Sequence, residues 1–210
     1  MAWHTPGQMW QRSAHHFWQT TTLPLLVFLC CGFVTLDVRW PSQATPRVIR
    51  MSIITTGMSE AMIARLYDAA AMWTSPAVRF ALSVNADTAN AGTIAVAAVA
   101  PQGRAGHFHL FTDGFISSCH VLIDLTAGPW HTGAEPPPPG SFDMQTSMAH
   151  EFGHCLGLGH SDQSVPPVLL RTLIHGGEFQ RTLSLDDISG RDALFPLASP
   201  AVRRSGCALF

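Results

Sequence analysis

Apolar residues recur along the chain with the spacing of strands in five places. A first β-rich run covers Val48–Ile54. The other runs, of which the last is the shortest, are Val78–Val84, Gly92–Val99, Cys119–Leu125 and His107–Phe111. Short apolar runs that are bounded by glycine, asparagine and proline are typical of strands. The pattern therefore predicts a sheet of four or five strands.

Helical spacing appears in the stretch between the first two strands. Ser59 and Glu60 have the character of a helix start, with a capping side chain followed by an acid in the first turn. The apolar residues that follow recur every three or four positions: Ile63, Leu66, Tyr67, Ala70 and Trp73. This periodicity predicts a helix that turns one face to the core.

A second helix is expected from about Asp143 to about Leu156. Four residues form an apolar stripe about 80° wide at 100° per residue: Met144, Met148, Phe152 and Cys155. His150 and His154 lie on the opposite side of the same helical wheel. One face is suited to a core, and the other presents two imidazoles one turn apart.

The N-terminus has the organisation of an export signal. Residues 23–36 read LPLLVFLCCGFVTL and carry no charge, and Arg12 precedes them. A positive segment before 7–15 apolar residues is typical of a secretory signal, and the run is shorter than the roughly 20 residues of a membrane-spanning helix. A buried N-terminal helix is the alternative, but Pro24 and the lack of a polar face count against it. We expect a secreted protein, with cleavage after Gly32 or retention as a membrane anchor both left open.

These boundaries predict three parts: a signal peptide or anchor at 1–36, one folded domain at 37–197, which carries the motifs discussed below, and a tail at 198–210. The chain of 210 residues has room for one ordinary domain. Its 47% hydrophobic content and 12% charged residues exclude a disordered chain. The net charge of −2 and the absence of a basic stripe exclude nucleic acid as an expected partner. We expect a monomer.

Eleven histidines are the unusual feature of the composition, and three of them stand close together. His150 and His154 are four residues apart on the expected helix, a spacing that lets both bind one zinc ion. Gly157 permits the positive φ that ends the helix, so that the chain reverses and delivers His160 as the third ligand. Three neutral ligands leave a fourth position for water, as in catalytic zinc sites.

Glu151 is the candidate general base of this constellation. It follows the first ligand but is rotated off the ligand axis, so its carboxylate lies beside the metal without binding it. Zinc lowers the pKa of a bound water towards ~7 and polarises a carbonyl, while Glu151 takes the proton. The sequence thus predicts a zinc endopeptidase with one catalytic ion. A non-catalytic zinc module that binds extended peptides is the alternative.

The segment HEFGHCLGLGH at 150–160 resembles the metzincin zinc motif, and its flanks resemble the matrixin branch. Ser161 after the third histidine, FDMQ at 142–145 and LSLDDISG at 183–190 carry the likeness. The resemblance implies an α+β fold: a twisted, mostly parallel sheet of about five strands, two long helices and a small C-terminal subdomain with a third helix. It also implies a substrate bound extended along an edge strand, which we expect at Cys119–Leu125.

The chain departs from the matrixin pattern in three places. The family has a methionine in the turn beneath the zinc, and we expect Leu169 or Leu170 to fill that position. Family members held latent use a pro-segment cysteine, whereas only Cys30 and Cys31 precede this domain. The structural-zinc pattern is not reproduced by the remaining candidates, which we interpret as scattered surface histidines rather than a second metal site: His107, His109, Asp113 and His120. No motif supports calcium, although a calcium site stays open.

Two further pairs have expected structural roles. Cys119 and Cys155 point to the core from a strand and from the second helix, and we hypothesise a disulfide between them over two free thiols. Asp186 and Asp187 follow Ser184 at a helix start, where capping explains at least one of them. In the resembling family, such a pair also ties this helix to the turn beneath the zinc.

Overall fold

The computed structural model describes residues 33–41, 46–86, 93–98, 104–161, 168–172 and 174–197. The greater part of the expected leader, Cys30 and Cys31, and the expected tail lie outside the described residues. Within the described part, no helix combines the length and apolar character needed to cross a membrane.

The elements follow the predicted order. The strands of the main sheet are β1 (Arg47–Ile54), β2 (Val78–Val84), β3 (Thr93–Ala98), β4 (Ala105–Thr112) and β5 (Phe115–Ile123). The helices are α1 (Glu60–Trp73), α2 (Met144–Leu156) and α3 (Leu185–Leu194), and two short strands, β6 (Trp130–His131) and β7 (Phe142–Asp143), pair before α2. The two predicted helices begin where they were expected, with Ser59 and Asp143 as their N-caps.

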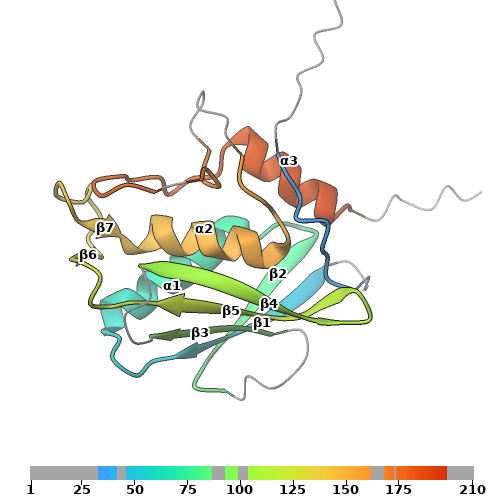
Figure 1. Cartoon of the computed structure of the whole chain (residues 1–210), viewed down its shortest axis with the longest axis horizontal. Helices are drawn as coiled ribbons and strands as arrows, with labels where there is room; N and C mark the ends of the chain where they lie inside the picture. Colours follow the sequence, from blue (N-terminus) through green and yellow to red (C-terminus); the bar gives the residue numbers. More distant parts are fainter. Residues whose placement is uncertain are drawn as a thin grey trace, which may run out of the picture. The chain divides into compact units, whose positions relative to one another are not determined.

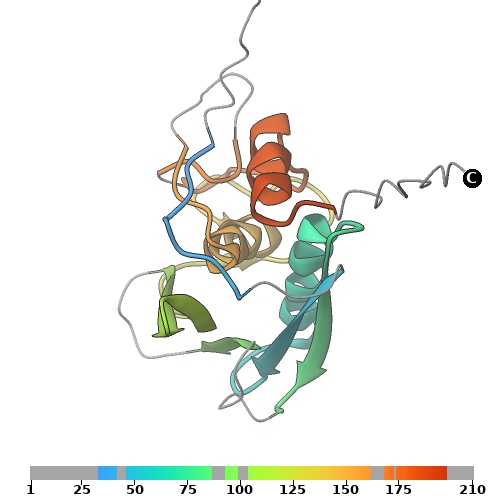
Figure 2. The same cartoon turned by 90° about the vertical axis from the view of Figure 1, so that its right-hand side faces the viewer.

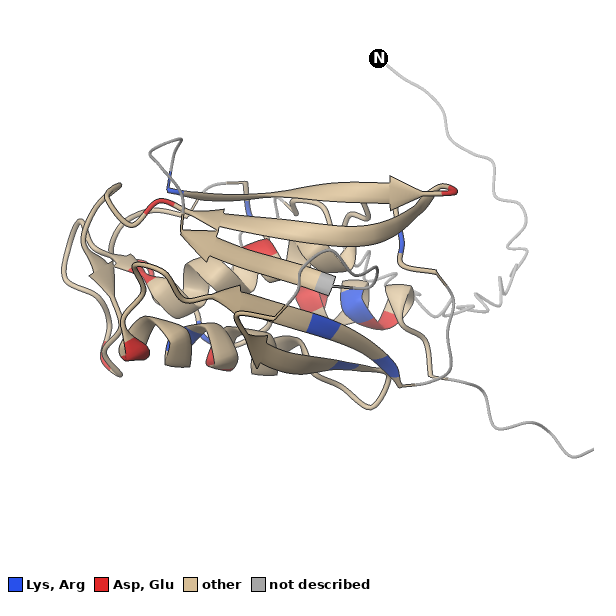
Figure 3. Ribbon diagram, turned by 90° about the horizontal axis from the view of Figure 1, so that it is seen from below, with Lys and Arg blue, Asp and Glu red and all other residues tan. Residues whose placement is uncertain are grey.

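The sheet has the strand order β2-β1-β3-β5-β4, and all of its pairings are parallel except β4–β5. Helices α1 and α2 lie on one face of it, and α3 lies beyond α2 (Figures 1 and 2). The other face is seen in Figure 3, where the ribbon positions of charged residues are few and dispersed. This arrangement confirms the α+β fold and its mostly parallel sheet.

The edge strand differs from our expectation. We placed the substrate edge at Cys119–Leu125, but β5 lies inside the sheet between β3 and β4. The edge strand beyond β5 is β4, which turns back onto β5 through Asp113 and Gly114, both with positive φ (52° and 78°). An Asp-Gly pair with this geometry is a strong hairpin signal, and it was present in the sequence. The assignment of Cys119–Leu125 as the edge was wrong because that hairpin was missed.

The core lies between the sheet and the two long helices. Side chains with no exposed surface fill it from every layer: Ile49, Met51, Ile53, Leu66, Trp73, Ile94, Val121, Ile123, Met148 and Phe152. Two tryptophans also bind the backbone of α2, since Nε1 of Trp73 donates to the oxygen of Ala149 (2.7 Å) and Nε1 of Trp40 to that of Cys155 (2.9 Å). Helix α2 is therefore held on several sides by packing and by hydrogen bonds.

Candidate metal centre

The ends of α2 are fixed by polar contacts that place its histidines. Asp143 accepts hydrogen bonds from the backbone nitrogen (2.9 Å) and hydroxyl (2.7 Å) of Thr146, and it pairs with Arg181 (2.5 and 3.0 Å). At the other end, Gly157 has a φ of 107°, where a side chain would be strained and a Cβ would lie 2.6 Å from the oxygen of Val38. This conformation stops the helix and turns the chain toward His160.

Three imidazoles meet at one point above α2. The Nε2 atoms of His150 and His154 are 3.0 Å apart, and those of His154 and His160 are 3.1 Å apart. The three side chains form a group whose ligand atoms all lie within 4.8 Å of one another. His150 and His154 are buried, whereas His160 is exposed. The structure thus brings together the three histidines that the sequence spacing selected.

Hydrogen bonds on the far side of two rings determine which nitrogen faces the centre. Nδ1 of His150 lies 2.9 Å from the oxygen of Leu169, and Nδ1 of His154 lies 2.7 Å from the oxygen of Leu158. A carbonyl oxygen only accepts, so each Nδ1 must carry the hydrogen, and in the neutral ring Nε2 then bears a lone pair. His160 makes no such bond to any residue that the structure describes.

Converging lone pairs are the test of whether a cation fits. Two unprotonated Nε2 atoms at 3.0 Å repel each other unless a positive charge lies between them. Nitrogens arranged tetrahedrally at 2.0–2.1 Å from zinc would lie about 3.3 Å apart, close to the observed separations. Three histidine nitrogens are also the donor set of known catalytic zinc sites. The residues present therefore fit a zinc ion.

Burial keeps these ligands in the form that binds a metal. Desolvation lowers the pKa of His154 to about 2, and it also lowers the pKa of His150, although the charge of Glu151 opposes the second shift. Both rings are therefore neutral at neutral pH, and metal binding there does not have to displace a proton.

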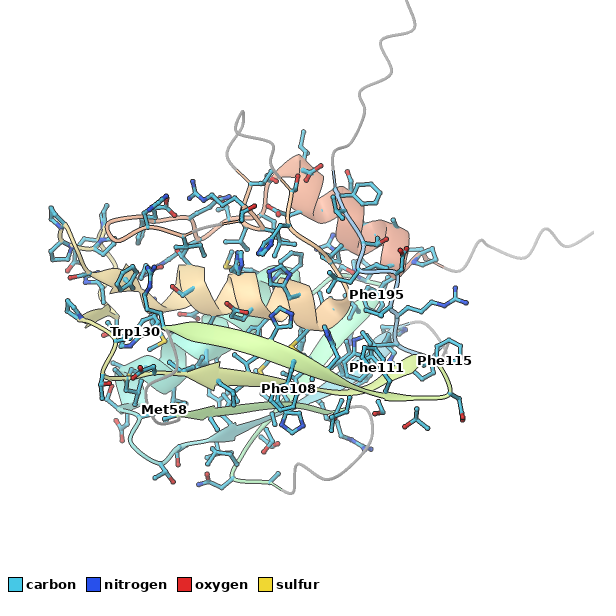
Figure 4. All side chains as sticks on the ribbon, viewed as in Figure 1. Met58, Phe108, Phe111, Phe115, Trp130 and Phe195 are labelled. Carbon is cyan, nitrogen blue, oxygen red and sulfur yellow. A yellow bond between two sulfur atoms is a disulfide. The ribbon has the colours of Figure 1, made fainter. Side chains whose placement is uncertain are left out.

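Glu151 stands beside the ligands without joining them. Its carboxylate is not part of the ligand group, and its Oε2 lies 2.9 Å from Nδ1 of His107 on β4. Glu151 and the three ligands line a cleft of about 510 Å³, whose other walls include Arg104, Gly106, Trp130, Phe142 and Ile174. Figure 4 shows that Trp130 lies near the start of α2. A carboxylate next to an open metal position is suited to proton transfer.

Comparison with known proteins agrees with this geometry. The matrixin family profile matches residues 62–196, which include the sheet strands from β2 onward and all of the metal centre. The chain belongs to the matrixin family.

Two plant proteins are similar to parts of this matrixin. "Metalloendoproteinase 1" of Glycine max is 33% identical over 99 residues, which are 45% of this chain and 30% of the soybean protein. "Metalloendoproteinase 5-MMP" of Arabidopsis thaliana is 42% identical over 53 residues, 25% of this chain and 14% of that protein. The chain thus spans less than a third of the length of these relatives.

Two leucines form the turn beneath the metal centre, at the place where the resemblance to matrixins implies a methionine. Leu169 and Leu170 are buried (1% and 3% exposed). A Cβ on Gly153 would lie 2.7 Å from Cδ2 of Leu170 and 2.6 Å from Cζ2 of Trp73, so only glycine permits this packing. Gly153 was not among the predicted site residues, although a glycine inside a helix is a signal of close approach.

Asp187 connects this turn to α3. Its carboxylate accepts from the backbone nitrogens of Leu169 (3.1 Å) and Leu170 (3.3 Å). It also accepts from the nitrogen (2.8 Å) and hydroxyl (2.7 Å) of Ser184, which completes a capping box. Both expected roles, capping and tying the helix to the turn, are confirmed for this residue.

A short N-terminal segment supports the other side of the third ligand. Leu36 donates to the oxygen of Gly157 (2.9 Å), and Gly159 donates to the oxygen of Val34 (2.7 Å). These bonds form an antiparallel bridge between Thr35 and Leu158, directly before His160. Residues 33–36, which we counted with the leader, thus pack against the turn that carries a ligand. The hydrophobic pattern gave no signal of this, because the pairing uses only backbone groups.

The structure contains the hypothesised disulfide. Cys119 of β5 and Cys155 of α2 are bonded, and neither has exposed surface. The bond joins the sheet to the residue that follows His154. It therefore fixes the C-terminal end of the ligand-bearing helix.

We expected the remaining histidines to lie scattered on the surface, but two of them do not. His107 and His109 face α2: the ring of His107 stacks on that of His154 (4.5 Å between centroids, 23°), and Nε2 of His109 contacts the oxygen of His154 at 3.0 Å. His120 instead stacks on Phe108 (4.7 Å, 3°), and Asp113 lies in the hairpin turn. For His107 and His109 the expectation was wrong, because the missed hairpin sets which face of β4 meets the helix.

Proposed function

We propose that this matrixin is a zinc-dependent endopeptidase that hydrolyses peptide bonds, with Glu151 as its general base. The observation that carries the proposal is the convergence of three histidine nitrogens beside a carboxylate that is not a ligand. The cleft along these groups opens to solvent and runs beside an edge strand, so an extended chain has access to them.

In the proposed hydrolysis, the metal and the side chains of the protein have different roles. His150, His154 and His160 would hold zinc, which when bound acidifies water and polarises a carbonyl. Glu151 accepts a proton from the attacking water and returns one to the amine nitrogen as the C–N bond breaks. The outer hydrogen bonds from His150 and His154 to backbone oxygens hold both rings in the orientation that this requires.

The substrate would pair with β4 rather than with the strand we first selected. One side of β4 pairs with β5, and the other side has no strand beside it in the described sheet. Its first residues, Ala105 and Gly106, line the cleft together with the metal ligands. Backbone pairing with an edge strand binds an extended peptide largely without regard to its sequence. Protein or peptide substrates are therefore the proposed class.

The proposed location is outside the cell. The apolar leader with its upstream arginine supports export, and the disulfide between Cys119 and Cys155 is of the kind that persists in oxidising compartments. A form that stays attached to the membrane through an uncleaved leader is the alternative. Since residues 33–36 pair with residues 157–159, we place the start of the catalytic domain at residue 33 or earlier.

The test compares the full chain with Glu151→Gln, which keeps the shape of the side chain. Each protein is stripped of metal, titrated with zinc and assayed for cleavage of casein. We expect one zinc per chain in both and a rate about 10²–10⁴-fold lower in the variant. One bound zinc with no cleavage dependent on Glu151 would instead indicate the non-catalytic peptide-binding module.

A further inference from the structure

His107 makes two contacts with the proposed catalytic groups from outside the helix that carries them. It lies on the edge strand β4, with its side chain mostly buried (22% exposed). Its Nδ1 is 2.9 Å from Oε2 of Glu151, and its ring lies nearly parallel to that of His154. Neither contact follows from the zinc motif, which lies entirely within residues 150–160.

The hydrogen bond has only one possible direction. An ionised carboxylate accepts and does not donate, so the hydrogen is on Nδ1 of His107. Within the described part of the chain, this is the one hydrogen bond that the Glu151 side chain makes. It fixes one carboxylate oxygen and leaves Oε1 as the oxygen without a protein partner in that part of the chain.

We propose that His107 is a positioning residue that holds the Glu151 carboxylate in the orientation needed for proton transfer. The inference rests on the proposed function of Glu151. A glutamate on a helix has three side-chain torsions, and a general base acts only within hydrogen-bonding reach of the proton it takes. A partner that fixes one oxygen removes most of the unproductive orientations before the substrate arrives.

The position of His107 on β4 also connects the base to the substrate. The neighbouring residue Gly106 lines the same cleft, and β4 is the strand along which we place the peptide. The strand is held to β5 along its whole length, from Ala105 opposite Ile123 to Thr112 opposite Phe115. The element that would align the peptide therefore also aligns the carboxylate that acts on it.

The stacking of His107 on His154 offers a purely structural alternative, and two substitutions separate it from the hydrogen bond. In His107→Asn the side-chain nitrogen takes the place of Nδ1, so the donor remains while the ring is lost. In His107→Phe the ring remains while the donor is lost. A positioning role requires the donor, and a packing role requires the ring.

The experiment measures kcat and KM on a peptide substrate for the full chain and both variants, and zinc affinity by competition with a chelator. We expect His107→Phe to lower kcat about 10–100-fold, as loss of an outer hydrogen-bond partner does, with KM and zinc affinity nearly unchanged. His107→Asn should retain most of the activity. The reverse order, with Phe active and Asn inactive, or weaker zinc binding in His107→Phe, would overturn the proposal.

A second comparison tests whether His107 acts through Glu151. In the Glu151→Gln background, His107→Phe should cause no further loss of the residual rate, because the group it positions is already inactive. An additive loss would contradict the proposal. His120→Ala is the matched control, since this histidine stacks on Phe108 away from the cleft and should leave the kinetics unchanged. If the unmodified chain cleaves no peptide at all, the proposed function fails instead.

Discussion

The metal centre has a helix half and a loop half, and they are stabilised in different ways. His150 and His154 come from a helix that is buried along its whole length, and each has its outer nitrogen bonded to a backbone oxygen. His160 is exposed and follows a bridge in which two backbone hydrogen bonds join residues 157–159 to residues 34–36. Secondary structure and core packing thus order two of the ligands before any metal binds.

The difference indicates what each half contributes. The helix half is part of the hydrophobic core. The packing that stabilises the fold therefore also determines the geometry of its two ligands. The loop half depends on polar connections at some distance from the metal, above all on Asp187 beneath it. Substitutions in the helix half should therefore change the stability of the metal-free protein, whereas exposed positions in the loop half should change metal binding alone.

The largest expected effect comes from removing the disulfide that anchors the helix half. Replacing both Cys119 and Cys155 with alanine opens a link across 36 residues. On the chain-entropy model, this lowers the free energy of unfolding by about 3–4 kcal/mol. Urea denaturation of the metal-free full chain measures it. A change of less than about 1 kcal/mol would show that packing alone secures α2 on the sheet.

The next largest effect should come from Asp187→Asn, which weakens the connection beneath the loop half. The carboxylate accepts four hydrogen bonds in a buried position, and an amide replaces one of its oxygens with a donor. We expect a loss of about 2–3 kcal/mol in the free energy of unfolding. Asp192→Asn on the same helix is the control, because its side chain is 54% exposed. Equal losses in the two variants would contradict the assigned role.

Much of the fold and of the metal centre was predictable from the sequence, and the exceptions have physical reasons. The periodicities located both long helices, and the ligand spacing identified His150, His154 and His160, because these features depend on residues close together in the chain. The edge strand had a local signal, the Asp113-Gly114 hairpin, which we missed. The role of His107 and the pairing of residues 34–36 instead depend on contacts between distant segments. An apolar pattern does not encode such contacts, and backbone pairing leaves no trace in side-chain types.

Single ligand substitutions should have a smaller effect on the free energy of unfolding, and this effect should differ between the two halves. His150→Ala leaves the backbone oxygen of Leu169 without its donor in a buried place, and we expect the metal-free protein to lose about 1–3 kcal/mol of unfolding free energy. His160→Ala, at an exposed position, should change it by less than about 0.5 kcal/mol. Both should weaken zinc binding strongly. Similar losses of stability in the two variants would remove the distinction between the halves.

The last prediction concerns the pH dependence of the stability of the helix half. Burial lowers the pKa of His150 and His154 from 6.5 in the folded chain. The unfolded chain therefore binds more protons, and the free energy of unfolding of the metal-free protein should fall as the pH drops below about 6.5, by up to about 1.4 kcal/mol per pH unit for each histidine. Urea denaturation between pH 7.5 and pH 5 would measure the slope.

His175→Ala is the control for that titration, because this exposed histidine lies outside the metal centre and its removal should preserve the slope. His150→Ala should reduce it. A stability that stays constant across this range, or that rises as the pH falls, would contradict the buried neutral state of the helix ligands.

X-ray absorption at the zinc edge of the full chain, loaded with one equivalent of zinc, tests the account most directly. We predict three histidine nitrogens and one oxygen at 2.0–2.1 Å from the ion, and two histidine nitrogens in His160→Ala. A sulfur ligand at about 2.3 Å, or an unchanged spectrum in His160→Ala, would contradict a centre built from these three imidazoles.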